Sequence, residues 1–100
     1  MSRTFYSDYT KHALRFYARY SERPVRFNTE VDEANWTACD EILKKHSKLQ
    51  FDILCDVYRG RDTLSDEVYN ASKKYNIDQN IIWDLMKAVE HGVAKKRNLI

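Results

Sequence analysis

Residues 66–97, DEVYNASKKYNIDQNIIWDLMKAVEHGVAKKR, decide the fold, because they predict two helices joined by a turn of only a few residues. In the first half, Val68, Ala71 and Tyr75 recur at the spacing that places side chains on one face of a helix. A longer apolar stripe with helical spacing follows in the second half: Ile82, Leu85, Met86, Val89 and Val93. The stretch therefore predicts a helical hairpin whose second helix has one buried face.

Asn76, Ile77 and Asp78 supply the expected turn. Asn tolerates the left-handed conformation that often ends a helix, Ile77 can pack in the corner, and Asp78 can cap the next helix. We predict a helix break at residues 76–78 and a final helix that reaches at least Val93. This is the geometry of a helix-turn-helix, whose second helix enters a DNA major groove, although a hairpin that only packs in a core has the same pattern.

The composition favours one all-α domain. One hundred residues suffice for a single core, and two glycines and one proline leave few positions for the tight turns of a many-stranded sheet. We expect five helices in a single domain spanning residues 1–100. Its N-terminal helical part covers residues 1–46, and its helix-turn-helix part covers residues 49–97.

The charges concentrate basic residues toward the two ends of the chain, although the net charge is only +2. Residues 1–27 carry six bases and two acids, residues 28–46 two bases and five acids, and residues 66–100 six bases and five acids. MSRTFYSDY lacks the apolar segment of a signal peptide, and no apolar run approaches about 18 residues. We expect a cytoplasmic protein with no membrane partner.

Residues 4–21 predict a first, amphipathic helix. Phe5, Tyr9, Ala13, Phe16 and Tyr20 share one face at helical spacing. A basic stripe lies nearly opposite: Lys11, Arg15 and Arg19. We expect the aromatic face either to pair with a second copy of the chain or to fold back on the domain, and the basic stripe to be solvated or to contact phosphates. A membrane-surface helix is also amphipathic, but here the apolar face is mostly tyrosine.

Two further helices are expected in the middle of the chain, after a loop at Pro24. Thr29 is the expected cap of the first, residues 29–46, and Ser47 the cap of the second, which ends at Gly60. We expect the first to bury one face and to have a solvated acidic outer face. The buried face is expected to contain Val31, Asn35, Ala38 and Ile42, widened by Trp36, Cys39 and Leu43. Ser65 or Asp66 is then expected to cap the helix that opens the hairpin.

No catalytic or cofactor motif is present in the sequence. It contains no Gly-rich phosphate loop, no G-x-S-x-G element and no H-E-x-x-H pair. A zinc site built from Cys39, Cys55 and His46 has no supporting C-x-x-C or H-x-x-x-H element, so both cysteines are expected to be free, buried thiols. We therefore expect a protein that is not an enzyme and that holds no metal and no cofactor.

Residues 49–97 combine a helix ending in ILCDVY, a short loop carrying Thr63-Leu64, the hairpin VYNASKKYNIDQNIIWDLMKAVE and the basic Lys95-Lys96-Arg97. This arrangement resembles the fourth region of bacterial sigma factors, which reads the −35 promoter element. The resemblance is to the small sigma-like transcription regulators of phages and mobile elements, and it covers about half of the chain. It implies a sequence-specific DNA-binding regulator whose partners are double-stranded DNA and, as a second candidate, RNA polymerase.

In that family the helix that begins at the position of Asp78 enters the major groove. The resemblance therefore implies five candidate base contacts: Gln79, Asn80, Trp83, Asp84 and Lys87. The candidate phosphate contacts are basic residues before and after this helix: Lys73, Lys74, Lys95, Lys96 and Arg97. Gln and Asn can pair with adenine, and a carboxylate can accept from cytosine N4.

A protein-interaction module is the alternative to DNA recognition. In that case the same hairpin docks on RNA polymerase or on a second copy of the chain. Salt-dependent binding of random duplex DNA favours the regulator, and no binding at low salt favours the interaction module.

Overall fold

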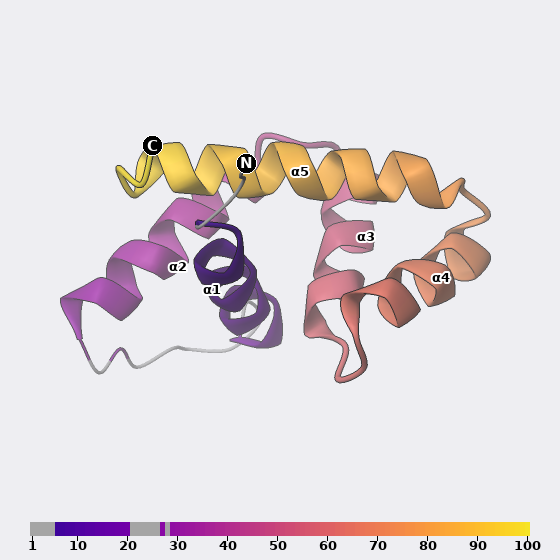
Figure 1. The fold of residues 1–100 in the computed structure, drawn as a ribbon, viewed down its shortest axis with the longest axis horizontal. Helices are drawn as coiled ribbons and strands as arrows, with labels where there is room; N and C mark the ends of the chain where they lie inside the picture. The colour runs from indigo at the N-terminus through magenta and orange to yellow at the C-terminus, as the bar shows by residue number, and fades with distance from the viewer. Residues whose placement is uncertain (1–5, 21–26, 28) are drawn as a thin grey trace.

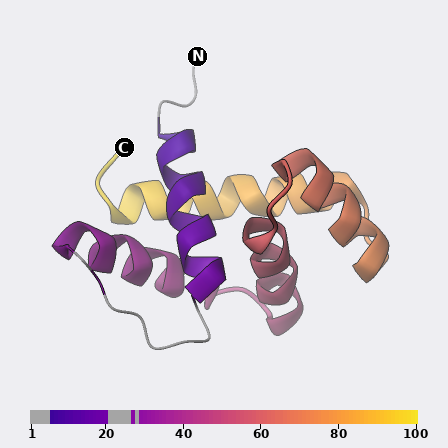
Figure 2. The same ribbon diagram turned by 90° about the horizontal axis from the view of Figure 1, so that it is seen from below.

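The computed structural model describes residues 6–20, 27 and 29–100. These residues form five α-helices and no strand, which confirms the all-α prediction: α1 (Ser7–Tyr20), α2 (Glu30–Leu43), α3 (Lys48–Arg59), α4 (Leu64–Tyr75) and α5 (Gln79–Lys96). The longest helix, α5, runs along one side of the molecule and contacts each of the other four (Figure 1). Seen from below, α1 crosses α5 between α2 and α3 (Figure 2). Helix α5 is thus the element on which the others are assembled.

The helix break at residues 76–78 and the long final helix are both confirmed. Helix α4 ends at Tyr75, and α5 continues past Val93 to Lys96. The predicted apolar stripes are buried at these positions: Val68, Ala71, Ile82, Met86, Val89 and Val93. Leu85 and Tyr75 are only partly buried but still pack against the core. The hydrophobic period therefore predicted this hairpin correctly.

The helix starts follow the predicted caps in α2 and α3 but not in α4. Thr29 and Ser47 each accept a hydrogen bond from a backbone N–H in the first turn, and Gln50 completes a capping box with Ser47. The prediction of Ser65 or Asp66 as the cap of α4 is wrong. Thr63 Oγ1 accepts from Asp66 N at 3.2 Å, so α4 begins at Leu64, which packs against the core.

The buried face of α1 differs from the predicted aromatic face. It consists of Thr10, Ala13, Leu14, Tyr17 and Ala18. Tyr9 and Tyr20 instead keep 40% and 41% of their surface exposed, and Phe5 lies outside the described residues. The small Ala13 and Ala18 let neighbouring helices approach α1 closely. Tyr17 lies on this face, where its hydroxyl donates to Asp40 Oδ1 at 2.6 Å and is therefore satisfied although the ring is buried.

The basic stripe of α1 also bonds to the end of α3, although Arg19 stays exposed, as expected for a solvated stripe. Arg15 donates to the carbonyls of Gly60 and Asp62, and Arg19 donates to those of Arg59 and Gly60. Gly60 leaves α3 in an extended conformation (φ −61°, ψ 157°) and not in the left-handed one that lets a helix bond its own last carbonyls. The two arginines satisfy these carbonyls, and their charge suits the negative end of the α3 dipole.

Helix α2 turns most of its predicted face toward the core, where Trp36 and Ile42 pack, but not the N-terminal end of that face. Its buried residues are Ala38, Cys39 and Leu43, whereas Val31 is 52% exposed. The first turn of α2 lies at the outer edge of the molecule, beyond the reach of the core (Figure 1). Where α2 meets α5, a Cβ atom on Gly92 would lie 3.1 Å from two carbons of Ile42. Gly92 therefore permits the close approach of these two helices.

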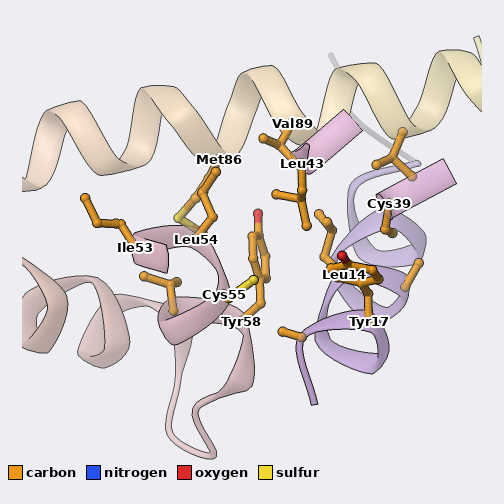
Figure 3. Close-up of a cluster of buried hydrophobic side chains, with 14 of the residues drawn as sticks. Leu14, Tyr17, Cys39, Leu43, Ile53, Leu54, Cys55, Tyr58, Met86 and Val89 are labelled. Atoms are coloured by element: carbon orange, nitrogen blue, oxygen red, sulfur yellow. The ribbon is translucent and has the colours of Figure 1, made fainter. Parts of the chain in front are cut away.

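One hydrophobic core joins all five helices. Figure 3 shows its centre, where Leu14, Leu43, Leu54 and Met86 surround the ring of Tyr58, which points from α3 toward α5. Cys39 and Cys55 are buried free thiols. Burial, assisted by the nearby Asp40, raises the pKa of the Cys39 thiol to about 12. This thiol therefore stays protonated and acts as a small apolar side chain.

Candidate nucleic-acid interface

The turn between α4 and α5 is compact and locally determined. Asn76 adopts the left-handed conformation (φ 54°, ψ 55°), and the N–H groups of Asn76 and Ile77 both bond to the carbonyl of Ser72. Ile77 packs against the core, and Asp78 Oδ1 accepts from Asn80 N at 2.7 Å. The first turns of α5 consequently form one end of the molecule, beside α4 (Figure 1).

Four of the five predicted base-contact residues lie exposed on this part of α5: Gln79, Asn80, Asp84 and Lys87. Helical spacing places Asn80, Asp84 and Lys87 on one face, turned away from the buried Ile82. Trp83 differs from the others, because it is half-buried and packs against the core. The structure thus gathers polar, hydrogen-bonding side chains on the outer face of α5, with the indole at the margin of this face.

Lys73 and Lys74, at the end of α4, have different surroundings. The Lys73 ammonium lies over the ring of Tyr69, 5.3 Å from its centroid, and the side chain is exposed. The Lys74 ammonium forms an ion pair with Asp56 of α3 at 2.8 Å, and Tyr75 donates to the same carboxylate. Burial acts to raise the pKa of Asp56, but hydrogen bonds from Lys74 and Tyr75 outweigh it and lower this pKa.

The three basic residues at the end of α5 also differ from one another. Lys95 is exposed, and it forms no ion pair with any residue in the described ranges. Lys96 lies 3.6 Å from a carboxylate oxygen of Glu41, and Arg97 Nε donates to Asn35 Oδ1 at 2.6 Å. Lys96 and Arg97 therefore connect the end of α5 to α2.

Glu90 is the buried carboxylate that the sequence analysis missed. It is 7% exposed, and it accepts from Tyr58 Oη at 2.7 Å, from Lys11 Nζ at 3.1 Å and from Ser7 Oγ at 3.4 Å. Burial and the adjacent Glu90 charge raise the pKa of Tyr58 well above its usual value, so the phenol remains a donor. One signal was available, because Glu90 follows Met86 by four residues on the apolar stripe.

Comparison with known proteins identifies no related family for this chain. It matches no protein family, no curated protein and no solved structure. Within the described ranges, no helix combines the length and the apolar character needed to cross a bilayer.

Proposed function

We propose that this protein is a sequence-specific DNA-binding transcription regulator of the phage or mobile-element type, which reads a duplex with the first half of α5. The proposal rests on one observation: Asn80, Asp84 and Lys87 are exposed on one face of a helix that begins directly after a compact turn, at one end of the molecule. An α-helix fits the major groove of B-DNA, where amide, carboxylate and ammonium groups can each distinguish base edges.

The surroundings of the turn support phosphate binding next to this face. Lys73, Asn76 and Gln79 are among the residues around a shallow hollow of about 670 Å³ at the start of α5. The N-terminus of a helix carries a partial positive charge that favours phosphate, and Lys73 adds a full charge beside it. Lys96 forms an exposed ion pair with Glu41, which contributes little to stability, so a phosphate can compete for its ammonium. Lys74 is held by the partly buried Asp56, so a phosphate would have to break that pair.

Selection of bound duplexes from a random pool tests this proposal. Asn80→Ala and Lys87→Ala should each weaken binding to the selected sequence by about 5-fold to 150-fold, and should relax preference at one position of the site. Lys73→Ala and Lys95→Ala should weaken binding equally for all sequences, and each should reduce the salt slope by about one.

Arg61→Ala is the matched control, because Arg61 is exposed on the α3–α4 connection, on the far side of the molecule from α5 (Figure 1). It should leave DNA binding unchanged. Absence of duplex binding at low salt would contradict the proposal. It would favour the second candidate, a protein-interaction module whose partner is RNA polymerase or a second copy of the chain.

The proposal includes pairing of two chains through α1. The rings of Tyr9, Phe16 and Tyr20 follow one another along this helix, outside its buried face, and those of Phe16 and Tyr20 lie 5.2 Å apart. A two-fold pair would present two copies of α5 to a roughly palindromic site. Binding by two copies of α5 would compensate for the weak DNA binding expected of one copy, whose positive charge is limited.

A further inference from the structure

A groove of about 780 Å³ lies between the first turn of α1 and the middle of α5. Tyr6 and Lys11 line it on the α1 side, and Trp83, Lys87 and His91 are among the residues on the α5 side. This volume is within the range of about 300–1,000 Å³ that is typical of sites for small organic ligands. The proposed DNA-binding function does not require such a groove.

The groove has an apolar, partly aromatic lining. Trp83 is half-buried with its ring against the core, Met86 beside it is buried, and Tyr6 is partly buried on the opposite side. Aromatic and thioether side chains offer flat, polarisable surfaces on which an aromatic ring can stack. The lining therefore suits a ligand with a planar ring better than a sugar or a peptide backbone.

The charges around the groove favour an anion. Glu90 is the one carboxylate among the described residues that line the groove. It already accepts from Tyr58, Lys11 and Ser7, so the Lys11 ammonium balances its charge and it has little capacity for a further donor. Lys87, four residues after Trp83 on the same face, is exposed and forms no ion pair with any residue that the structure describes. The groove therefore carries a net positive charge at neutral pH.

We propose that this groove binds a small planar aromatic anion, whose ring lies against Trp83 and Met86 and whose carboxylate, sulfonate or phosphate faces Lys87. Ligand binding to this groove can be measured without DNA, so it can be tested separately from DNA recognition. The two sites still share one residue, because Lys87 also belongs to the proposed reading face of α5. A ligand that engages this ammonium would remove one contact from the duplex.

The test uses anilinonaphthalene sulfonate, an aromatic anion with a planar naphthalene ring, and its uncharged analogue phenylnaphthylamine as the matched probe. The Trp36→Phe variant of the full chain leaves Trp83 as the single tryptophan, and the buried Trp36 Nε1 has no hydrogen-bond partner to lose within the described residues. We expect saturable binding of one anilinonaphthalene sulfonate per chain, quenching of Trp83 fluorescence and an unchanged circular dichroism spectrum. The neutral analogue should bind at least about fivefold more weakly, because it cannot form a charged hydrogen bond with Lys87.

Two substitutions on α5 locate the site. Lys87→Ala should weaken binding of the anion at least about fivefold and leave binding of the neutral probe unchanged. Lys95 lies eight residues later and outside the groove, so Lys95→Ala should leave the affinities for both probes unchanged. The proposal is overturned by equal affinity for the two probes, by equal effects of the two substitutions, or by binding of many probes per chain. The last result is the signature of a loosely packed protein. None of these outcomes depends on whether the protein binds DNA.

Discussion

At the scale of single residues, Asp56 fixes the position of the hairpin relative to α3. Its carboxylate accepts from Lys74 and from Tyr75, which are the last two residues of α4. Because these bonds lower the pKa of Asp56 in the folded protein, the group favours folding only while it is ionised. This contribution is complete above the unfolded-state pKa of about 4 and is lost as the pH falls through the folded-state value.

Asp56→Asn should therefore destabilise the protein at pH 7 by an amount that shrinks toward zero as the pH falls below about 4. The amide still accepts from Tyr75 but cannot pair with the charge of Lys74. Urea unfolding of both proteins across this pH range measures the difference. Asp52→Asn is the control, because among the described residues Asp52 forms an ion pair with Lys48 alone, and this pair is exposed and lies within α3. A difference for Asp56→Asn that stays constant with pH would contradict this role.

Side chains that shape or cap the backbone next to them could be predicted from the sequence. Side chains that bond to residues far along the chain could not. Asn76 and Asp78 were predicted correctly because left-handed conformation and capping depend on a few neighbouring residues. Glu90 pairs with Tyr58 across 32 positions, and Arg15 bonds to Gly60 across 45. Nothing in the spacing of a single sequence identifies such partners.

At the scale of elements, α4 and α5 end in the same way. The first ends in KKYNI and the second in KKRNL, and both asparagines are left-handed, with φ 54° at Asn76 and φ 59° at Asn98. The N–H of Ile77 bonds to Ser72 O at 3.1 Å, and that of Leu99 bonds to Ala94 O at 2.8 Å. In each case the left-handed residue turns the chain so that the N–H of the next residue bonds to a carbonyl in the last turn of the helix.

Asn76→Val should destabilise the protein by about 1–2 kcal/mol, because a β-branched residue is strained in the left-handed region. Asn76→Gly should be neutral or slightly stabilising, since Gly adopts this conformation at no steric cost. Chemical denaturation followed by circular dichroism measures both. Asn70→Val, at an exposed position inside α4, is the matched control and should change little, because Val and Asn have similar helix propensities. Equal losses at Asn70 and Asn76 would show that the turn does not require this conformation.

The predicted face was correct for α5, whose apolar residues are mostly aliphatic, and wrong for α1, whose predicted face is mostly tyrosine and phenylalanine. In α5, the side chains of Ile82, Met86 and Val89 are apolar, so burial stabilises them without leaving a polar group unsatisfied. Their spacing therefore indicated the inner face correctly. In α1, Tyr9 and Tyr17 are equally amphipathic, and each hydroxyl finds an acceptor on α2, so the residue type does not show that Tyr17 is the buried one. The orientation of α1 therefore depends on tertiary contacts that the helical period does not contain.

At the scale of the whole molecule, the length of α5 separates two parts of the proposed DNA interface. Its 18 residues span about 27 Å, so Gln79 and Lys96 lie at opposite ends of the molecule. Base contacts at the start of α5 and phosphate contacts at its end would therefore fall on different parts of a duplex. The orientation of the whole domain on DNA would then depend on how α1 to α4 pack along α5.

Self-association is the last prediction, and it concerns the outer face of α1. We expect a dimer that dissociates in the micromolar range, because three partly exposed rings cover less than the roughly 800 Å² per partner of a standard stable interface. The double variant Tyr9→Ser/Tyr20→Ser should be monomeric in sedimentation equilibrium and should lose little unfolding free energy, since both rings lie outside the core. Tyr69→Ser on α4, where the ring is 50% exposed, should leave the dimer intact. A native chain that stays monomeric throughout the micromolar range would rule out pairing through α1 and leave each α5 to read DNA alone.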